Sequence, residues 1–520
     1  MDAASTLGAP ATALRLPVRV TPLRLAIALS AVAFAVRLID LNGRPLWLDE
    51  AYSAWFSAQS WHVLWTEVPK YETHPPFYYS LLKLWRTVFG GTAVALRSFS
   101  MLFGVAAMPL VVAASLELEH QRPTGRPLLR SGIAAFLAAC SPMLVLLGQE
   151  ARPYPLLIFA YALATLGLLR LLREFGSGPG DWASWLMLAA GAELGLWAHG
   201  LGLLYAFCLA GALAPAWLKP PFSRDRLVRG IVAASLTGIL YLPCLLMIVN
   251  RAGDWGGHGW LTWSPVMTLQ LLSLYAVPVE VLTIGSAVAA LVMILLAKRA
   301  AQDGLTTVGW TADRALLLLW WGPPLIAVVV SQLGMPIFLV RTLAGTLIPA
   351  YLALAGVLAR AQSPRERLAL AAALVITLIP STLQVALRPA TESWGEVAAY
   401  LQRNVRPGDQ VWVYPNDSAL PLREAGASGA LRGIPGDYPA IGIKGPIRAG
   451  SPAVVSLTSA QAENVARDPA LRTVPTLWLV TRQSAVFDTH NDVPRALAQV
   501  RRPGREQDWG YIAVRPYYLR

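Results

Sequence analysis

The sequence predicts an α-helical polytopic membrane protein with about eleven transmembrane helices, interfacial helices and a small α/β domain at its C-terminal end. Three observations support this fold class. The chain has 520 residues, of which 55% are hydrophobic and 14% are charged, whereas a soluble protein has about 25% charged residues. Many apolar runs approach the length of a membrane span. After residue 387 Pro, Gly, Asp and Asn become frequent, and no run is long enough to span.

Eleven apolar runs come close to the roughly 20 residues that a helix needs to cross a bilayer. The first run follows Arg15 and Arg19, has Arg24 at its start and lacks a clear cleavage site. We therefore expect a retained first helix and not a removed signal peptide. The runs are 23–40, 96–116, 131–148, 155–172, 184–198, 203–218, 230–249, 281–297, 315–331, 342–359 and 368–387.

Segment 77–90, FYYSLLKLWRTVFG, is either a short span or a helix in the membrane interface. If it does not span, the linkers on the side of the N-terminus carry 15 Lys or Arg residues and the opposite linkers carry 3. A spanning segment would reverse this bias, against the positive-inside rule, and Lys83 and Arg86 disfavour a position in the membrane core. We therefore expect an interfacial helix on the outer face, a cytoplasmic N-terminus and an outer C-terminus.

The region after the last run predicts one small α/β domain. Segment 394–405 is typical of an amphipathic helix, and 410–415, 475–480 and 510–518 are typical of strands. The predicted organisation is a cytoplasmic tail over 1–22, a transmembrane domain over 23–387 and a soluble extracytoplasmic domain over 388–520.

The basic character of the chain does not indicate a nucleic-acid partner. The net charge is +13, but the basic residues lie in short linkers between apolar runs, where they orient a chain in the membrane. The three cysteines lie inside apolar runs without a CxxC pair, and the six histidines show no HxxxH spacing. The sequence therefore gives no support for a disulfide framework or a zinc site.

The loop after the first run begins NGRPLWLDEAYSAWF and contains the adjacent acids Asp49 and Glu50. One interpretation is a helix cap, in which the aspartate accepts backbone N–H bonds beside tryptophans of an interfacial belt. The other is a general base, since an acid at a membrane face can take a proton from a substrate. These residues alone leave both interpretations open.

The same loop continues as YETHPPFYYSLLKLW. A rigid turn before a helix explains the two prolines, but it does not explain His74 or the tyrosines Tyr71, Tyr78 and Tyr79. A histidine and tyrosines at the depth of lipid headgroups are hydrogen-bond donors suited to a phosphate or a sugar. Tyr71 is therefore a candidate phosphate ligand, and Tyr78 is a candidate ligand of a sugar or an acceptor.

Three further outer segments carry candidate residues. In GQEARPYPLL, Arg152 either snorkels outward as an anchor or binds an anionic headgroup through charge-assisted hydrogen bonds. Its neighbour Glu150 is a candidate contact for the sugar or acceptor, as is His199, which otherwise anchors a helix end. Loop 254–260, DWGGHGW, is either a mobile gate over this site or part of the interfacial belt.

Together, LWLDEAYSAW, HPPFYY and QEARPYPLL resemble the bacterial family-39-type glycosyltransferases of the GT-C fold, relatives of protein O-mannosyltransferases and of lipid A aminoarabinose transferases. The resemblance covers residues 25 to about 415 and includes LWAHGLGLLYAF, FLVRTLAGTLIP and ESWGEVAAYLQRNVRPGDQVWV. It implies that 23–387 is a catalytic domain with 41–95 as its active-site loop. It also implies transfer of a sugar from a polyprenyl-phosphate donor to an acceptor hydroxyl at the outer face of the bacterial inner membrane.

The resemblance also implies roles for individual residues. Asp49 matches the family's essential acid, proposed as the catalytic base or as a group that orients the acceptor, and Glu50, its neighbour in the acid pair, is the second catalytic candidate. His74 occupies the position before the prolines, where relatives place a residue that touches the donor phosphate. Arg152 and Arg341 would neutralise that phosphate, although many relatives have a tyrosine after the second arginine, where this chain has a threonine.

The resemblance implies no cofactor. The sequence contains no Walker loop or GxGxxG signature that could hold a nucleotide, and a divalent ion held by Asp49, Glu50 and Glu150 is the less favoured alternative because relatives of this type are generally metal-independent. The expected partners are a polyprenyl-phosphate sugar, a lipid or glycan acceptor and membrane lipids. Two other functions remain open, namely a transporter or flippase for a polyprenyl lipid and an inactive scaffold whose outer domain binds a partner.

Overall fold

The fold is that of a computed structural model of the chain. The described residues are 20–70, 72, 74–220, 222–255, 263–274, 312–360, 364–427, 430–438 and 457–520. Tyr71, the predicted span 281–297 and residues 256–260 of the expected gate loop lie outside these ranges.

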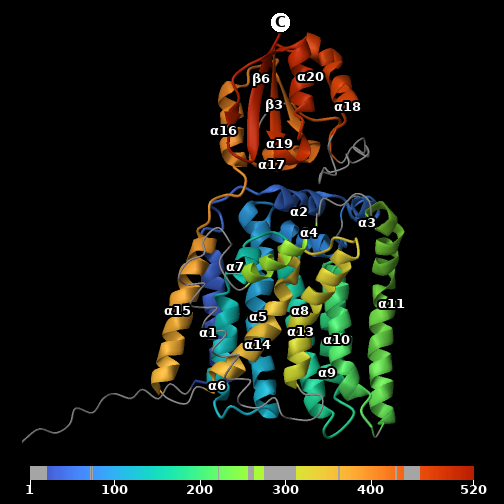
Figure 1. Cartoon of the computed structure of the whole chain (residues 1–520), viewed down its shortest axis with the longest axis vertical. Helices are drawn as coiled ribbons and strands as arrows, with labels where there is room; N and C mark the ends of the chain where they lie inside the picture. The colour runs from blue at the N-terminus through green and yellow to red at the C-terminus, as the bar shows by residue number, and fades with distance from the viewer. Residues whose placement is uncertain are drawn as a thin grey trace, which may run out of the picture.

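The larger part of the chain is a bundle of apolar helices (Figure 1). These helices are α1 (Pro22–Leu38), α5 (Ala93–Gln121), α6 (Pro127–Ala139), α7 (Pro142–Gly148), α8 (Tyr154–Glu174), α9 (Trp182–Ala198), α10 (Gly202–Trp217), α11 (Arg224–Trp255), α13 (Ala312–Gln332), α14 (Leu347–Leu358) and α15 (Pro364–Ala386). They coincide with ten of the eleven predicted runs, and the eleventh is 281–297. Within the described ranges, five helices are long and apolar enough to cross a membrane, or six when α6 and α7 count as one bent span.

The predicted run 131–148 forms two helices. α6 and α7 meet at an angle of 54°, and the Ser141 side chain caps the second helix. Such a break leaves backbone carbonyls without intrahelical partners. The buried guanidinium of Arg37 in α1 satisfies one of them at the end of α6, since Nη1 donates to the Ala139 carbonyl at 3.0 Å, and Nη2 donates to the Leu144 carbonyl in α7 at 3.3 Å. This cation in an apolar run therefore holds the bent helix pair.

Helices α8 and α9 approach each other through glycines. A Cβ atom at Gly167 would lie 2.5 Å from the Leu188 nitrogen, and one at Gly191 would lie 2.4 Å from the Ala164 nitrogen. Small residues allow this close backbone approach between membrane helices. Since α8 begins just after the turn at 149–153 and α9 ends just before His199, the close contact holds both segments at one end of the bundle.

Short helices gather at the end of the bundle that faces the C-terminal domain (Figure 1). Segment 77–90 forms a helix of 13 residues, which is about 20 Å long and shorter than the roughly 30 Å hydrocarbon core of a bilayer. It buries Tyr78, Tyr79 and Leu82, and Gly90 ends it with a φ of 84°. The short helices are α2 (Leu48–Ala58), α3 (Trp61–Thr66), η1 (Val68–Lys70), α4 (Phe77–Phe89), η2 (Pro265–Leu274) and η3 (Val340–Thr346).

The C-terminal domain is a mixed sheet with helices on both faces (Figure 1). Its strands are β1 (Gln410–Tyr414), β2 (Leu431–Gly433), β3 (Thr476–Arg482), β4 (Arg502–Pro503), β5 (Gln507–Asp508) and β6 (Ile512–Tyr518). The strand order is β2-β1-β3-β6-β4, with β5 paired to β6. β1 runs parallel to β2 and β3, and β6 runs antiparallel to β3. The helices are α16 (Trp394–Asn404), η4 (Asn416–Ser418), α17 (Ala419–Glu424), α18 (Ser459–Ala466), η5 (Pro469–Arg472), α19 (Ser484–Phe487) and α20 (Asp492–Val500).

Alternate residues of the central strands belong to two separate cores. Trp412 and Leu479 pack with α18 and α20, whereas Val413 and Val480 pack with α16 and α17. Successive side chains of a strand point to opposite faces, so both faces of the sheet centre are buried, as is usual for parallel strands. The predicted helix and three predicted strands correspond to α16, β1, β3 and β6. β2 was not predicted, because three residues show no periodicity.

Candidate active site

Asp49 lies in the first turn of α2, where two arginines from distant segments meet its side chain. Arg341 in η3 places Nη2 at 3.0 Å from Asp49 Oδ2. Arg152, in the turn before α8, places its own Nη2 at 3.8 Å from the same oxygen and donates from Nη1 to the Asp49 carbonyl at 3.0 Å. Two guanidinium groups thus face one carboxylate. The three side chains together therefore carry one net positive charge.

The two arginines differ in their exposure. The Arg152 side chain is 5% exposed, and the Arg341 side chain is 24% exposed. Arg341 also lies over the rings of Trp47 and Tyr154, at 5.5 and 5.6 Å from their centroids. A guanidinium over an aromatic face is attracted by the ring quadrupole. Arg341 is therefore the more accessible of the two cations, and its position is fixed by two rings as well as by Asp49.

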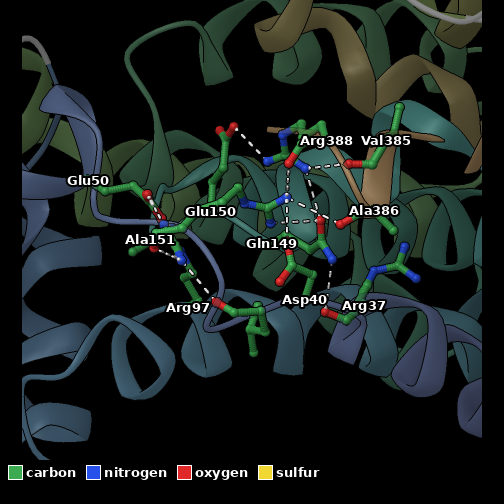
Figure 2. A network of polar contacts seen from close by, with 12 residues as sticks. Arg37, Asp40, Glu50, Arg97, Gln149, Glu150, Ala151, Val385, Ala386 and Arg388 are labelled. Atoms are coloured by element: carbon green, nitrogen blue, oxygen red, sulfur yellow. Dashed lines mark hydrogen bonds and ion pairs between the residues drawn. The ribbon is translucent and has the colours of Figure 1, made fainter. Parts of the chain in front are cut away.

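Glu50 faces the bundle interior and is fully buried. Arg97 at the start of α5 donates to both of its carboxylate oxygens, from Nε at 2.7 Å and from Nη2 at 2.6 Å. The backbone N–H of Ala151 donates to Glu50 Oε1 at 3.0 Å. Protein donors therefore occupy both oxygens of Glu50, and this contact ties α2 to the turn that carries Arg152 (Figure 2).

Arg97 is a site residue that the sequence reasoning missed. Besides the two bonds to Glu50, it donates to the backbone carbonyls of Leu41, Arg44 and Pro45. A guanidinium has five N–H donors, so all of them are used. The signal that could have found it is a single cation at the start of a long apolar run, since a charge at such a position is costly unless it has partners.

The turn at 149–153 is held by a second polar network (Figure 2). The Gln149 amide donates to the carbonyls of Arg37 and Ile39 and accepts from Arg44 and Arg388. Arg388, just after α15, also lies 3.4 Å from Glu150. Burial raises the pKa of the Glu150 carboxyl to about 6, more than Arg388 lowers it. This carboxyl therefore changes charge close to neutral pH.

A chain of three polar side chains lies beside Tyr154 and connects the loop before α4 to the end of α9. His74 Nδ1 is 2.5 Å from Glu72 Oε1, and His74 Nε2 is 3.0 Å from His199 Nε2. The backbone N–H of Leu201 donates to His199 Nδ1 at 3.0 Å, so this nitrogen carries no proton. Neutral His199 then donates from Nε2 to His74, and His74 donates from Nδ1 to Glu72. One backbone bond thus fixes both tautomers.

Electrostatics favour the uncharged form of both rings. Burial lowers the pKa of His74 below 6.5 more than Glu72 raises it. For His199, burial, His74, Arg152 and Arg341 all lower the pKa well below 6.5. Burial raises the pKa of Glu72, but His74 and Arg152 together lower it to about 2. At neutral pH the chain therefore consists of a carboxylate and two neutral imidazoles.

Tyr78 lies next to the segment that carries Arg152. It is fully buried in α4, and its hydroxyl lies 2.9 Å from the Ser100 hydroxyl, which donates to the Arg152 carbonyl at 3.1 Å. Its contacts support the segment that carries Arg152.

Thus the structure brings Asp49, Arg152 and Arg341 together, with His74, His199 and Glu150 on adjoining segments. Across the described residues, no group of three or more His, Cys, Asp or Glu side chains is arranged to hold a metal ion.

A bundle of apolar helices that is closed at one end by short helices and followed by a small domain with a sheet is the fold of the GT-C membrane proteins. The chain is an integral membrane protein with this fold. ArnT from Cupriavidus metallidurans, bound to undecaprenyl phosphate, aligns with a TM-score of 0.58 and 14% identity over 94% of this chain and 97% of that chain.

Two other solved GT-C structures are also similar. The oligosaccharyltransferase from Archaeoglobus fulgidus, tethered to an acceptor peptide, gives a TM-score of 0.53 and 16% identity over 93% of this chain and 72% of that chain. The arabinofuranosyltransferase AftD from mycobacteria gives 0.52 and 17% over 96% of this chain and 42% of that chain. Neither a protein-family model nor a curated protein sequence matches the chain. At these identities the likeness shows the fold.

Proposed function

We propose that this protein is a membrane glycosyltransferase that moves a sugar from a polyprenyl-phosphate donor to an acceptor hydroxyl. The observation that carries the proposal is the convergence of Arg152 and Arg341 on Asp49 at one end of a GT-C bundle. ArnT has been solved with undecaprenyl phosphate, and the archaeal oligosaccharyltransferase AglB with a dolichol-phosphate. A lipid phosphate is the kind of anion that two adjacent guanidinium groups bind well.

The proposed reaction is a single displacement at the anomeric carbon. The acceptor oxygen forms a bond to this carbon while the bond from carbon to the phosphate oxygen breaks. Asp49 takes the proton of the acceptor hydroxyl, and the bonding electron pair leaves with the lipid phosphate. Arg152 and Arg341 stabilise the negative charge that develops on the departing phosphate. In the state without donor, the same arginines hold Asp49 in place.

The geometry supports different roles for the remaining residues. We assign Glu50 a positioning role in place of the catalytic role that the resemblance implies, because Arg97 and Ala151 occupy its oxygens. His74 stays a candidate contact for the donor phosphate, with His199 behind it. Tyr71 stays a candidate phosphate ligand. For the sugar and the acceptor, the candidates remain Tyr78, Glu150 and His199, of which Tyr78 is the most deeply buried.

We further propose that the reaction needs no metal ion. An arginine faces each carboxylate that could bind one, namely Arg341 at Asp49, Arg97 at Glu50 and Arg388 at Glu150. A cation at these oxygens would have to displace a guanidinium. Arginines can themselves supply the charge that a metal would bring to a phosphate.

The distribution of basic residues supports a location for the reaction. With α4 as an interfacial helix, the linkers opposite the catalytic end of the bundle carry most of the Lys and Arg residues, as cytoplasmic loops do. We therefore propose that the site and the C-terminal domain lie on the extracytoplasmic side of the bacterial inner membrane. A polyprenyl-linked donor suits this side, because the membrane lipid itself delivers the sugar.

The test compares glycolipids and glycans by mass spectrometry in a deletion strain that is complemented with different variants. We expect one glycan or glycolipid to lose a single sugar in the deletion strain and in the Asp49→Asn strain. The wild-type gene should restore it. The control is Asp468→Asn, which removes a carboxylate that pairs with Arg432 in the C-terminal domain; it should restore the sugar.

Two outcomes would count against the proposal. If Asp49→Asn fully restored the missing sugar, with equal protein amounts in the membrane, Asp49 would not be the catalytic base. Translocation of a polyprenyl lipid in proteoliposomes, with no missing sugar in the deletion strain, would instead favour a flippase.

A further inference from the structure

The helix that carries Asp49 is held from two sides. Asp49 and Glu50 of α2 face the bundle, where they meet Arg341 and Arg97. The C-terminal domain lies above α2 in Figure 1, and its helix α17 contacts α2. The side-chain contacts of α2 with this domain lie at Tyr52 and Trp55, which are three residues apart and share one face of the helix, and a further contact is made by the backbone amide of Leu48. α2 is therefore a layer between the two domains.

The first contact is at the N-terminal end of α2. The N-terminal amides of a helix have no intrahelical partner, and Trp47 at the N-cap position makes no side-chain capping bond. Glu392, from the segment before α16, supplies the missing acceptor, because its Oε2 accepts from the Leu48 amide at 3.0 Å. A carboxylate at this end also interacts favourably with the helix dipole.

Glu392 is in turn held by the C-terminal domain. Its Oε2 accepts from the Trp394 indole at 2.6 Å, and its Oε1 accepts from Arg482 Nε in β3, also at 2.6 Å. Glu392 is 3% exposed and Arg482 is 7% exposed. A buried carboxylate with three donors has one favoured position. The strand β3 therefore fixes the acceptor that caps α2, one residue before Asp49.

Two further contacts extend the attachment along α2. The Tyr52 hydroxyl donates to Asp417 Oδ2 in η4 at 2.6 Å. The ring of Tyr438 packs against Tyr52 and Trp55, with centroids 5.3 and 5.6 Å apart. The contacts of α2 with the C-terminal domain are thus hydrogen bonds at Leu48 and Tyr52 and ring contacts at Tyr52 and Trp55. They fix the rotation of α2 about its axis, which decides whether Asp49 points at Arg341.

We propose that Glu392 and Asp417 are positioning residues, through which the C-terminal domain holds α2 and keeps Asp49 in register with Arg152 and Arg341. The domain is then part of the catalytic apparatus and more than a soluble appendage. The catalytic consequence rests on the proposed function, whereas the mechanical coupling of the domain to α2 does not. The two claims are tested by separate measurements.

The coupling is tested by amide hydrogen exchange on the full-length protein in lipid nanodiscs. Glu392→Leu removes the cap, and Tyr52→Phe removes only a hydroxyl, so the second variant keeps the test valid if the first does not fold. The control is Asp468→Asn, which breaks an ion pair with Arg432 in the same domain, outside the α2 contacts. We expect peptides covering 47–55 to exchange roughly fivefold faster in both test variants, as the loss of one hydrogen bond implies, and to be unchanged in the control.

The catalytic consequence is tested by kinetics with a polyprenyl-phosphate sugar. The test variants should lower kcat roughly tenfold or more while the KM for the donor changes less than twofold, because Arg152 and Arg341 remain in place. Glu392→Gln keeps an acceptor for the Leu48 amide and should recover part of kcat. Equal exchange over 47–55 in all variants would overturn the coupling. Faster exchange with unchanged kcat would overturn the positioning role. An inactive wild-type protein would count against the proposed function, and the exchange data would still decide the coupling.

Discussion

His74 and His199 are 125 residues apart in the sequence, yet their Nε2 atoms lie 3.0 Å apart. Two imidazole nitrogens at this distance share one proton, and the Leu201 amide determines that His199 donates it. Protonation of the acceptor nitrogen would place two N–H groups against each other. The pair is therefore stable only while one of these two nitrogens is unprotonated, which makes its stability depend on pH.

The first prediction concerns acid stability. Burial lowers the pKa of both histidines in the folded state below the ordinary value of 6.5. The unfolded chain then binds more protons than the folded protein as the pH falls through 6.5, so this contribution to stability is complete above pH 6.5 and is lost on acidification. We expect a lower Tm at about pH 5.5 than at about pH 7.5.

His199→Gln should flatten this dependence, whereas His62→Gln, at an exposed histidine of α3, should leave it as in the wild type. The measurement is thermal unfolding in nanodiscs across this pH range. A full wild-type slope in His199→Gln would show that the pair is not responsible. Glu72 does not contribute to this pH dependence, because its pKa is lowered to about 2 in the folded protein. The stability that Glu72 contributes is complete above about pH 4.5 and is lost only as the pH falls from there to about 2.

The second prediction concerns Glu150, whose pKa is raised to about 6. Above this pH the carboxylate pairs with Arg388 and helps to hold the turn that carries Arg152. Because the pKa of Glu150 is higher in the folded protein than its ordinary value of 4.5, the folded protein binds this proton more tightly than the unfolded chain does. The contribution of Glu150 to the free energy of unfolding therefore falls as the pH rises from 4.5 to about 6. Over the same range the carboxylate forms and pairs with Arg388. We expect transferase activity to rise through an inflection near pH 6.

Glu150→Gln should remove this inflection, because the amide does not titrate. The control is Glu463→Gln, at a carboxylate that is 55% exposed in the C-terminal domain. The measurement is the pH profile of kcat. An inflection that persists in Glu150→Gln would assign it to another group.

The third prediction compares two Arg→Lys substitutions. In Arg97, five N–H donors hold Glu50 and three backbone carbonyls in the interior. A lysine keeps the charge but offers three donors, so Arg97→Lys leaves two buried acceptors without partners and should destabilise the protein by about 1–3 kcal/mol for each. Arg173→Lys changes an ion pair of a 40% exposed arginine with Glu117, and should change stability by at most about 1 kcal/mol.

The readout is the yield of monodisperse protein in detergent together with its Tm. Equal behaviour of Arg97→Lys and Arg173→Lys would contradict the structural role of the Arg97 network.

The fourth prediction concerns the more accessible cation of the site. Arg341→Ala should weaken the binding of undecaprenyl phosphate at least about tenfold, since a charge-assisted hydrogen bond to phosphate is lost. Arg467→Ala, at a 75% exposed arginine of the C-terminal domain, is the matched control. The measurement is a binding titration in detergent with undecaprenyl phosphate as the probe. Unchanged affinity in Arg341→Ala would move the phosphate site away from η3.

Much of the architecture follows from local patterns in the sequence. Apolar length predicted the helices of the bundle, and the distribution of Lys and Arg separated α4 from the spans, because its 13 residues with Lys83 and Arg86 suit an interface and not a membrane core. The family resemblance carried by the motifs around Asp49 and Arg152 also implied site roles for these residues and for Arg341. The apolar runs depend on neighbours within one helix, whereas the charge bias is a sum over linkers along the chain and needs no knowledge of which residues meet in space.

Only the tertiary structure decided which side chains pair. Glu50 is 47 residues from Arg97, and Leu48 is 344 residues from Glu392. No periodicity connects such positions, because a buried ion pair or a helix cap depends on the distance between atoms in space and not along the chain. The sequence showed that a pair of acids follows the first apolar run. The packing of the bundle and the C-terminal domain around α2 decided that Asp49 meets the arginines of the site while Glu50 holds the fold.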